Sequence, residues 1–267
     1  MIPIIKWELG QRKGYIMWWC IGCVALIGLL LLIYPSIHDQ ATVLNKVLNQ
    51  LPAGLRELKT GGAAADISSP IGYLNAQVYY VTLPLLFSIM TIGLGSSLLA
   101  RDEQNHTLEL LLARPVSRGK LLAAKVIAGL LIVAIVSSVT TIATLLLAKA
   151  VSLDVDTAYL LLINLYTTLF ALSFGFIGLV LSSASTLTSR FSRAAAVLVA
   201  FGGYLLASLS GLTHWLQTPA KFAPYHYFDP TQILHGHLSK GLDAYLLFVF
   251  VGGALLAWIG FRRRDIN

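Results

Sequence analysis

Charge is scarce in this sequence of 267 residues: 12% of the residues are Asp, Glu, Lys or Arg, whereas 57% are hydrophobic. An average soluble domain has about 25% charged residues, so the composition excludes a soluble globular protein. It also excludes an intrinsically disordered chain, because such a chain needs low hydrophobicity and high net charge. The composition therefore predicts an integral membrane protein.

The few charged residues leave six long, uncharged and apolar runs. A run of 18 or more apolar residues is long enough to cross the hydrocarbon layer as a helix. The runs are continuously apolar rather than alternating, which excludes a β-barrel. We expect an all-α integral membrane protein, a single transmembrane domain over 1–267, with spans at about 15–34, 73–99, 126–148, 158–182, 194–213 and 244–261.

The middle of every predicted span lacks Asp, Glu, Lys and Arg. Such groups mark ion pathways, proton relays and voltage sensors, so their absence argues against an ion-coupled transporter, a pump relay or a voltage-gated channel. The spans carry hydroxyl groups instead, which either line a weakly polar path or form hydrogen bonds between packed helices. The candidates for lining a path are Thr82, Ser88, Thr91, Thr167 and Ser208.

Motifs of enzymes are also missing. The sequence contains neither HExxH for zinc nor GxxxxGK[ST] for nucleotide phosphates, so we assign no catalytic residue. Cys20 and Cys23 share one helix face among apolar neighbours, and we expect them to pack rather than to bind a metal.

Histidines gather in the last predicted outer loop. His226, His235 and His237, with Asp229 nearby, are residue types that bind transition metals. The alternative is an interfacial aromatic belt, which the neighbouring Tyr225, Tyr227 and Phe228 favour.

Lys and Arg are distributed unevenly. If both termini are cytoplasmic, thirteen of the nineteen lie on the cytoplasmic side and six on the outer side. The positive-inside rule therefore predicts cytoplasmic termini. This asymmetry accounts for the net charge of +7, and no basic stripe interleaved with aromatics indicates a nucleic-acid partner.

Two segments outside the spans have amphipathic patterns. The segment 2–13 mixes Ile, Trp and Leu with charged residues, which predicts a short helix in the cytoplasmic interface; the alternative is a simple flanking anchor. It is not a signal peptide, because its basic residues precede a run of full spanning length. In the first outer loop, 35–70, leucines recur at helical spacing, which predicts one or two amphipathic helices on the outer membrane surface or over the pore; the alternative is a structural lid.

The segment between the second and third spans has the most specific pattern. Residues 107–113 favour a helix, and Pro115 ends it because proline disfavours helical geometry at the residue before it. Ser117 then stands where the next helix would have its N-cap. The pattern predicts a short cytoplasmic helix held between two spans, as expected of a lever that a soluble partner presses. The alternative is an ordinary positively charged loop.

This stretch, with Leu-Ala-Arg-Asp-Glu followed by Thr-Leu-Glu-Leu-Leu-Leu-Ala-Arg-Pro-Val-Ser-Arg, resembles the first cytoplasmic loop of ABC-2 type transporter permeases. The C-terminal Phe-Arg-Arg-Arg-Asp-Ile and the basic, Trp-containing N-terminus are similar to those of the family as well. The resemblance implies a coupling helix over about 102–118 that contacts an ATPase. Its residues would be Asp102, Glu103, Thr107, Glu109, Arg114, Pro115, Ser117 and Arg118.

The same resemblance implies the partners. Two copies of a separate ABC ATP-binding subunit would bind ATP and Mg²⁺, so this chain would be no enzyme and would hold no cofactor. A second permease protomer, most often identical, would complete the complex in the lipid of a prokaryotic inner membrane. The expected function is ATP-driven export of a hydrophobic or amphiphilic solute, such as a drug, antibiotic, lipid or peptide. The alternative is an ATPase-coupled scaffold that transmits a conformational change to an extracytoplasmic protein without transport.

Overall fold

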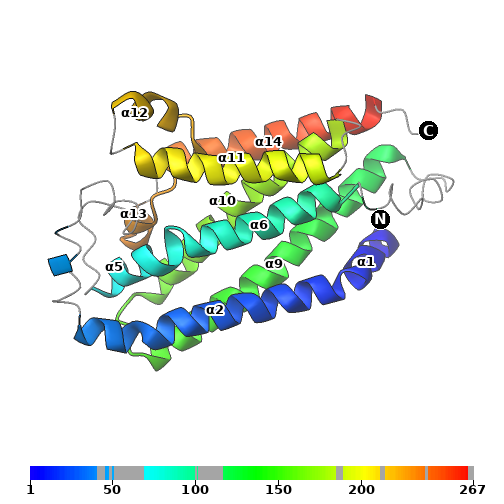
Figure 1. Cartoon of the computed structure of the whole chain (residues 1–267). Coiled ribbons are helices and arrows are strands. Elements are labelled where there is room, and N and C mark those ends of the chain that lie inside the picture. The colour runs from blue at the N-terminus through cyan, green and yellow to red at the C-terminus, as the bar shows by residue number, and fades with distance from the viewer. Residues whose placement is uncertain are drawn as a thin grey trace.

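The computed structural model describes residues 1–40, 46–47, 50, 69–99, 101, 117–184, 189–210, 214–237 and 240–263. These residues form helices and turns without a strand, and six helical segments are long and apolar enough to cross a membrane (Figure 1). The prediction of an all-α protein with six spans is therefore confirmed. The spans are Lys13–His38, Pro70–Ser97, Arg118–Ala150, Thr157–Ser183, Phe191–Leu209 and Lys240–Arg262.

Most spans begin or end several residues away from the predicted positions. The third span is helix α9 (Arg118–Ala150), whose 33 residues rise about 50 Å against a hydrocarbon layer of about 30 Å. Hydropathy locates the lipid-embedded part of a helix, whereas backbone hydrogen bonding and caps decide where the helix ends. Lys125, predicted just before the span, consequently lies inside α9, two turns from its start.

The second span is broken in its outer part. It consists of α5 (Pro70–Leu74), the π-helix η1 (Asn75–Tyr79) and α6 (Thr82–Ser97). Pro84, in the first turn of α6, has no N–H to donate, and a π-helical turn leaves backbone groups out of register. The hydroxyl of Thr82 donates to the carbonyl oxygen of Gln77 at 2.7 Å, which satisfies one of these groups inside the membrane.

The helices form two groups that meet along a seam. Helix α9 packs mainly against α2 (Lys13–Asp39) and the short N-terminal α1 (Ile2–Gln11). Helix α10 (Thr157–Ala184) packs mainly against α6, α14 (Lys240–Arg263) and α11 (Ser189–Leu209). The contacts of α9 with α6, α10 and α14 are fewer, so fewer residues meet across the boundary between these two groups than within either group.

The closest helix crossing joins α6 to α10. A Cβ at Gly95 would overlap the carbonyl oxygen of Gly175, and one at Gly175 would lie 2.9 Å from Cβ of Thr91. A Cβ at Gly178 would lie 3.4 Å from the carbonyl oxygen of Ile92. The small residues of the fourth span therefore face their own bundle, where they let two backbones approach closely.

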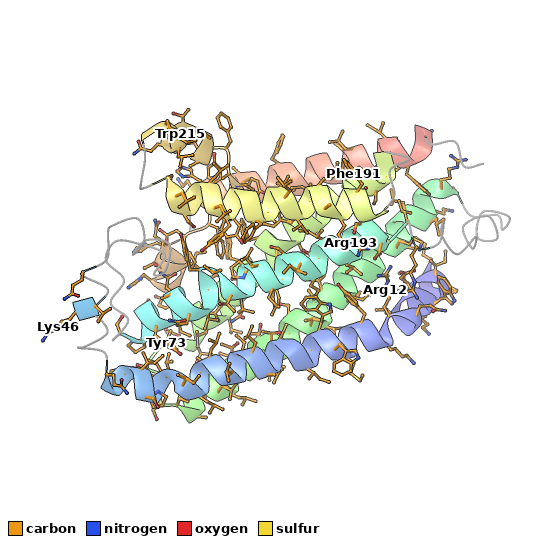
Figure 2. All side chains as sticks on the ribbon, viewed as in Figure 1. Arg12, Lys46, Tyr73, Phe191, Arg193 and Trp215 are labelled. Atoms are coloured by element: carbon orange, nitrogen blue, oxygen red, sulfur yellow. The ribbon has the colours of Figure 1, made fainter. Side chains whose placement is uncertain are left out.

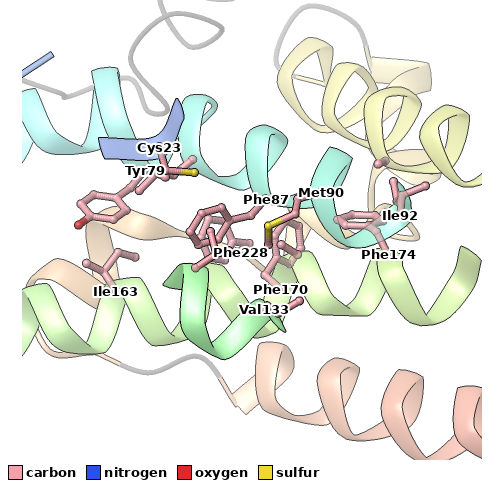
Figure 3. Close-up of a cluster of buried hydrophobic side chains, with 14 of the residues drawn as sticks. Cys23, Tyr79, Phe87, Met90, Ile92, Val133, Ile163, Phe170, Phe174 and Phe228 are labelled. Atoms are coloured by element: carbon pink, nitrogen blue, oxygen red, sulfur yellow. The ribbon is translucent and has the colours of Figure 1, made fainter. Parts of the chain in front are cut away.

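After the fifth span the chain folds back into the bundle through α12 (His214–Ala220), the 3₁₀-helix η2 (Pro224–His226) and α13 (Pro230–Leu234). Tyr225 and Phe228 are buried, and their rings lie 4.8 and 4.5 Å from that of Phe170, near the midpoint of α10. Figure 3 shows Phe228 and Phe170 within the apolar core. The prediction of an interfacial aromatic belt is therefore wrong for Tyr225 and Phe228, because both rings turn into the core.

Two of the residues considered as metal ligands, Asp229 and His235, form local hydrogen bonds instead. Asp229 caps α13 by accepting hydrogen bonds from the backbone of Thr231 and Gln232, and Nδ1 of His235 lies 2.8 Å from the carbonyl oxygen of Thr231. No group of three metal-binding side chains occurs among the described residues. The leucine-rich pattern of the first outer loop lies almost entirely outside them.

Candidate functional site

Most of the predicted coupling helix lies outside the described residues, namely Asp102, Glu103, Thr107, Glu109, Arg114 and Pro115. The structure does describe its end, Ser117 and Arg118. Ser117 has extended backbone angles, and its hydroxyl accepts a hydrogen bond from the backbone N–H of Lys120 at 3.4 Å. Ser117 is therefore the N-cap of α9, as predicted, and Arg118 is the first helical residue.

A set of buried charges lies where α6 ends and α9 begins, and we call Glu8, Arg12, Lys125 and Ser97 the inner charge cluster. Nε of Arg12 lies 2.6 Å from Oε1 of Glu8, and Nζ of Lys125 lies 3.2 Å from Oε2. The guanidinium of Arg12 also donates to the hydroxyl and the carbonyl oxygen of Ser97, at 3.0 and 3.3 Å. Each carboxylate oxygen of Glu8 thus has its own cation.

These charges are almost fully removed from the surface: Glu8 is 3% exposed, Arg12 5% and Lys125 0%. Burial by itself raises the pKa of Glu8, but the charges of Lys125 and Arg12 and the hydrogen bonds from both outweigh it and lower that pKa below its ordinary value. Glu8 is therefore an anion that neutralises buried cations, and removing it would leave Arg12 and Lys125 without a counter-charge in the interior.

The sequence places these residues together through the bend between the first two helices. Glu8 lies in the last turn of α1, and Arg12, four residues later, is the residue between the end of α1 at Gln11 and the start of α2 at Lys13. Both side chains are buried, whereas Ile2 and Trp7 are exposed. The sequence predicted an interfacial helix over 2–13 but did not pair its charges with Lys125. In the sequence, Glu8 and Arg12 are spaced one helical turn apart, and Lys125 directly precedes an apolar run. This pattern does not show that α1 packs against α9.

The cluster connects α1 to both flanks of the predicted coupling segment. Ser97 is the last residue of α6, before the segment, and Lys125 follows it by two turns in α9. A second bond lies close by, from the hydroxyl of Tyr15 to the carbonyl oxygen of Met90 at 2.7 Å. Figure 2 shows Arg12 and Arg193 toward the same end of the bundle. Residues Glu8, Arg12 and Tyr15 therefore bind α6 and α9, the two helices that flank the predicted coupling segment.

The hydroxyl groups predicted to line a path are mostly buried between helices of this chain. Ser88 donates to the carbonyl oxygen of Pro84 and Thr91 to that of Ala171, both at 2.6 Å. The hydroxyls of Ser208 and Tyr80 lie 3.1 Å apart. Thr167 is fully buried, and its hydroxyl has no partner among the described residues. Whether these groups line a path in another conformation stays a prediction.

The fold and the site define a class: a multi-pass, all-helical membrane protein with a buried ionic cluster at the base of one inter-span segment. Comparison with protein families gives the next step. The family described as ABC-2 family transporter protein matches residues 3–259, so the chain belongs to that family. This confirms the resemblance seen in the loop. No curated protein matches the chain, and no solved structure matches it.

Membership makes the chain the membrane subunit of an ABC transporter, with ATP hydrolysis in a separate protein. An ATP-binding partner subunit is therefore implied. The six spans and the family together identify a multi-pass membrane protein.

Proposed function

We propose that the chain forms the membrane path for ATP-driven export of a hydrophobic or amphiphilic solute across a prokaryotic inner membrane. Two identical protomers would each bind one ATP-binding subunit on the side that carries both termini. ATP and Mg²⁺ would be bound by that subunit. The observation that carries the proposal is the match to the ABC-2 transporter family over residues 3–259.

The arrangement of the helix ends supports the proposed site of coupling. The N-terminal helix α1, the end of α6, the start of α9 and the end of α14 all lie at one end of the bundle (Figure 1). In the topology that the sequence predicts, thirteen of the nineteen Lys and Arg residues lie on the side of the termini, which the positive-inside rule favours as the cytoplasmic side. A cytoplasmic ATPase would therefore meet the segment 101–117, whose two flanks the inner charge cluster holds.

The connectivity supports a mechanical role for that segment. It joins α6, from one helix group, to α9, from the other. A force on this segment would therefore act across the boundary between the two helix groups, where fewer residues are in contact. The interior offers apolar walls with hydroxyl groups, and the buried charges of the inner cluster are paired at one end. Such walls suit an apolar or amphiphilic solute rather than a small ion.

The test uses the complex of the permease with its ATPase, recovered by tagging the permease in native membranes and identifying the co-purified nucleotide-binding protein. Glu109→Ala combined with Arg114→Ala should reduce ATP turnover by the reconstituted complex about tenfold, as expected for a coupling free energy of 1–3 kcal/mol. Lys149→Ala with Lys221→Ala, on the predicted outer side, is the matched control and should keep full turnover. Full turnover in the Glu109/Arg114 variant would refute the coupling role.

A second measurement separates export from a scaffold role. ATP turnover in proteoliposomes is followed while hydrophobic and amphiphilic solutes are added. Export predicts that a solute stimulates turnover and accumulates on the side opposite the ATPase. A complex whose turnover no solute changes, but which changes with an extracytoplasmic protein, would be a scaffold instead.

A further inference from the structure

An apolar groove runs along the seam at the end of the bundle that carries the termini. It has a volume of about 320 Å³, including open space at its mouth, and lies between α6, α9 and α10. Leu98, Val126 and Leu179 line it near the helix ends, and Gly129 and Gly175 line it further in. The only polar residue in the lining is Thr91, whose hydroxyl already donates to the carbonyl oxygen of Ala171. The groove therefore suits a hydrocarbon chain.

The mouth of the groove faces the region between α9 and α14. Leu130, a lining residue of α9, is 38% exposed, and Phe176 of α10 packs against α14, where a Cβ at Gly253 would lie 3.3 Å from its ring. Nearer the helix ends the two helices meet, because a Cβ at Gly119 would lie 3.4 Å from Nε1 of Trp258. The groove therefore opens toward lipid on the membrane-interior side of the contact between Gly119 and Trp258.

Cations and an indole surround that contact. Arg118 and Lys120 occupy the first turn of α9, and the guanidinium of Arg262 lies 4.6 Å from the ring centroid of Trp258 on α14. Lys120 and Arg262 are exposed. Among the described residues at this end of the bundle, the single carboxylate is that of Glu8, which is held inside the inner charge cluster. The exposed cations Lys120 and Arg262 and the indole of Trp258 therefore lie nearer the ends of α9 and α14 than the residues that line the groove.

We propose that this groove and these three residues bind an anionic phospholipid of the adjacent leaflet, with its phosphate at Lys120, Arg262 and Trp258 and one acyl chain in the groove. Charge complementarity selects the lipid: Lys and Arg near a membrane surface each attract anionic headgroups by about 1 kcal/mol, and basic pockets between membrane helices bind such headgroups. Trp prefers the interface, where its N–H can reach a phosphate oxygen. The spacing fits, since Val126 lies six residues, or about 9 Å, along α9 from Lys120.

The proposal of a bound lipid does not depend on the transport proposal, because it rests on the lining of the groove and on the exposed cations beside it. The lipid would fill the seam between the two helix groups, on the face where α9 and α14 diverge. Its acyl chain would add dispersion contacts to Leu130, which is 38% exposed. The headgroup would neutralise Lys120 and Arg262, which have no carboxylate beside them in the described part of the chain.

Tryptophan quenching tests the site directly. The full-length chain keeps Trp258, while Trp7, Trp18, Trp19 and Trp215 are replaced by Phe. The protein is reconstituted in phosphatidylcholine vesicles that contain a small fraction of lipid brominated near the headgroup end of its acyl chains. Brominated phosphatidylglycerol should quench Trp258 more strongly than brominated phosphatidylcholine at the same fraction. Equal quenching by the two lipids would overturn the proposal.

Variants separate the headgroup site from the groove. Lys120→Gln with Arg262→Gln should weaken the apparent affinity for phosphatidylglycerol about thirtyfold, which corresponds to about 1 kcal/mol for each cation. Lys149→Gln with Lys221→Gln, at the opposite end, is the matched control and should retain the preference. Gly129→Leu should fill the groove and reduce quenching, whereas Gly22→Leu, where nothing lies within 4 Å of the added Cβ, should not.

Two further results distinguish a bound lipid from a site for free phosphate and from unselective lipid contact. Inorganic phosphate added to the vesicles should leave the extra quenching unchanged; its loss would indicate a site for free phosphate and refute the lipid. Lipid extracted from the purified wild-type protein should be enriched in anionic phospholipid relative to the Lys120/Arg262 variant. Equal enrichment in both would also overturn the proposal, and this measurement does not depend on the tryptophan replacements.

Discussion

At the scale of single residues, the inner charge cluster makes Glu8 a sensitive position. Glu8→Gln should destabilise the protein by about 3–5 kcal/mol, because it leaves the buried cations Arg12 and Lys125 without their anion. Lys125→Met alone should cost less, since Arg12 still pairs with Glu8, and Lys125→Met added to Glu8→Gln should recover part of the Glu8→Gln loss because it removes one of the two uncompensated cations. Thermal unfolding of the four proteins in detergent measures the interaction energy, and simple additivity of the two losses would contradict the pairing.

The lowered pKa of Glu8 gives the cluster a defined pH dependence. A carboxyl group with a lower pKa in the folded state stabilises the fold above its ordinary pKa of 4.5, and that stabilisation is lost as the pH falls through the lowered value. Wild-type stability should therefore be insensitive to this group at neutral pH and should fall at acidic pH. Glu8→Gln should fall less steeply below pH 4.5 in unfolding curves. Parallel curves would show that folding does not lower the pKa of Glu8.

Two buried threonines should respond oppositely to the same replacement. Thr91→Val removes a hydrogen bond of 2.6 Å to the backbone of α10 and should cost about 0.6 kcal/mol, the average for such bonds in membranes. Thr167→Val removes a buried hydroxyl without a partner in the described part of the chain, so stability should stay the same or rise. Paired melting temperatures measure both, and a larger loss for Thr167→Val would indicate a partner for its hydroxyl.

At the scale of helices, the crossing of α6 and α10 depends on glycine. Gly95→Ala would place a Cβ against the carbonyl oxygen of Gly175, a backbone atom that yields only if the helices separate. We expect a loss of about 1–3 kcal/mol from overpacking. Gly22→Ala, at a position with open space around the added Cβ, should be neutral or slightly stabilising because alanine favours the helix. Comparable thermal shifts in the two variants would argue against the close crossing.

Sequence patterns predicted the helices better than their partners. Charge-free runs located all six spans, because hydrophobic length is a property of the local sequence, and Ser117 was identified as an N-cap by the same local chemistry. The inward turn of Tyr225 and Phe228, in contrast, follows from their contact with Phe170, more than 50 residues earlier in the chain. The burial of Glu8 likewise depends on Lys125, from another helix. Local patterns do not encode such pairings.

At the scale of the whole molecule, the two helix groups are joined by polar contacts at several levels of the seam. Arg12 and Tyr15 cross it at one end, through Ser97 and the carbonyl oxygen of Met90. Toward the other end the hydroxyls of Ser137 and Thr168 lie 2.6 Å apart, and Tyr73 donates to the carbonyl oxygen of Leu30. The apolar groove separates these contacts on the α9 side. The seam is thus held by a small number of bonds, with deformable apolar packing between them.

This arrangement predicts that ATP binding shifts the groups as units. Spin labels at Ile127 on α9 and Leu255 on α14, both exposed, report across the seam, whereas Ile127 with Met17 on α2 reports within one group. With Cys20 and Cys23 replaced by Ala and labelled protomers diluted with unlabelled ones, pulsed EPR on the complex should show the first distance shifting by about 2 Å or more on ATP binding. The second distance should stay constant.

Arg12→Gln tests whether the bond to Ser97 restrains that motion. Loss of the guanidinium removes both the hydrogen bonds to Ser97 and a charge partner of Glu8, so the seam should populate the shifted arrangement before ATP is added. Ser97→Ala separates the two effects, because it removes one bond across the seam and leaves the Glu8 ion pairs intact. If Ser97→Ala shifts the resting distribution in the same direction as Arg12→Gln, the bond across the seam is the restraint. If only Arg12→Gln shifts it, the ion pair between Glu8 and Arg12 is the restraint. The N-terminal helix then limits the motion through its own stability and not through its bond to α6.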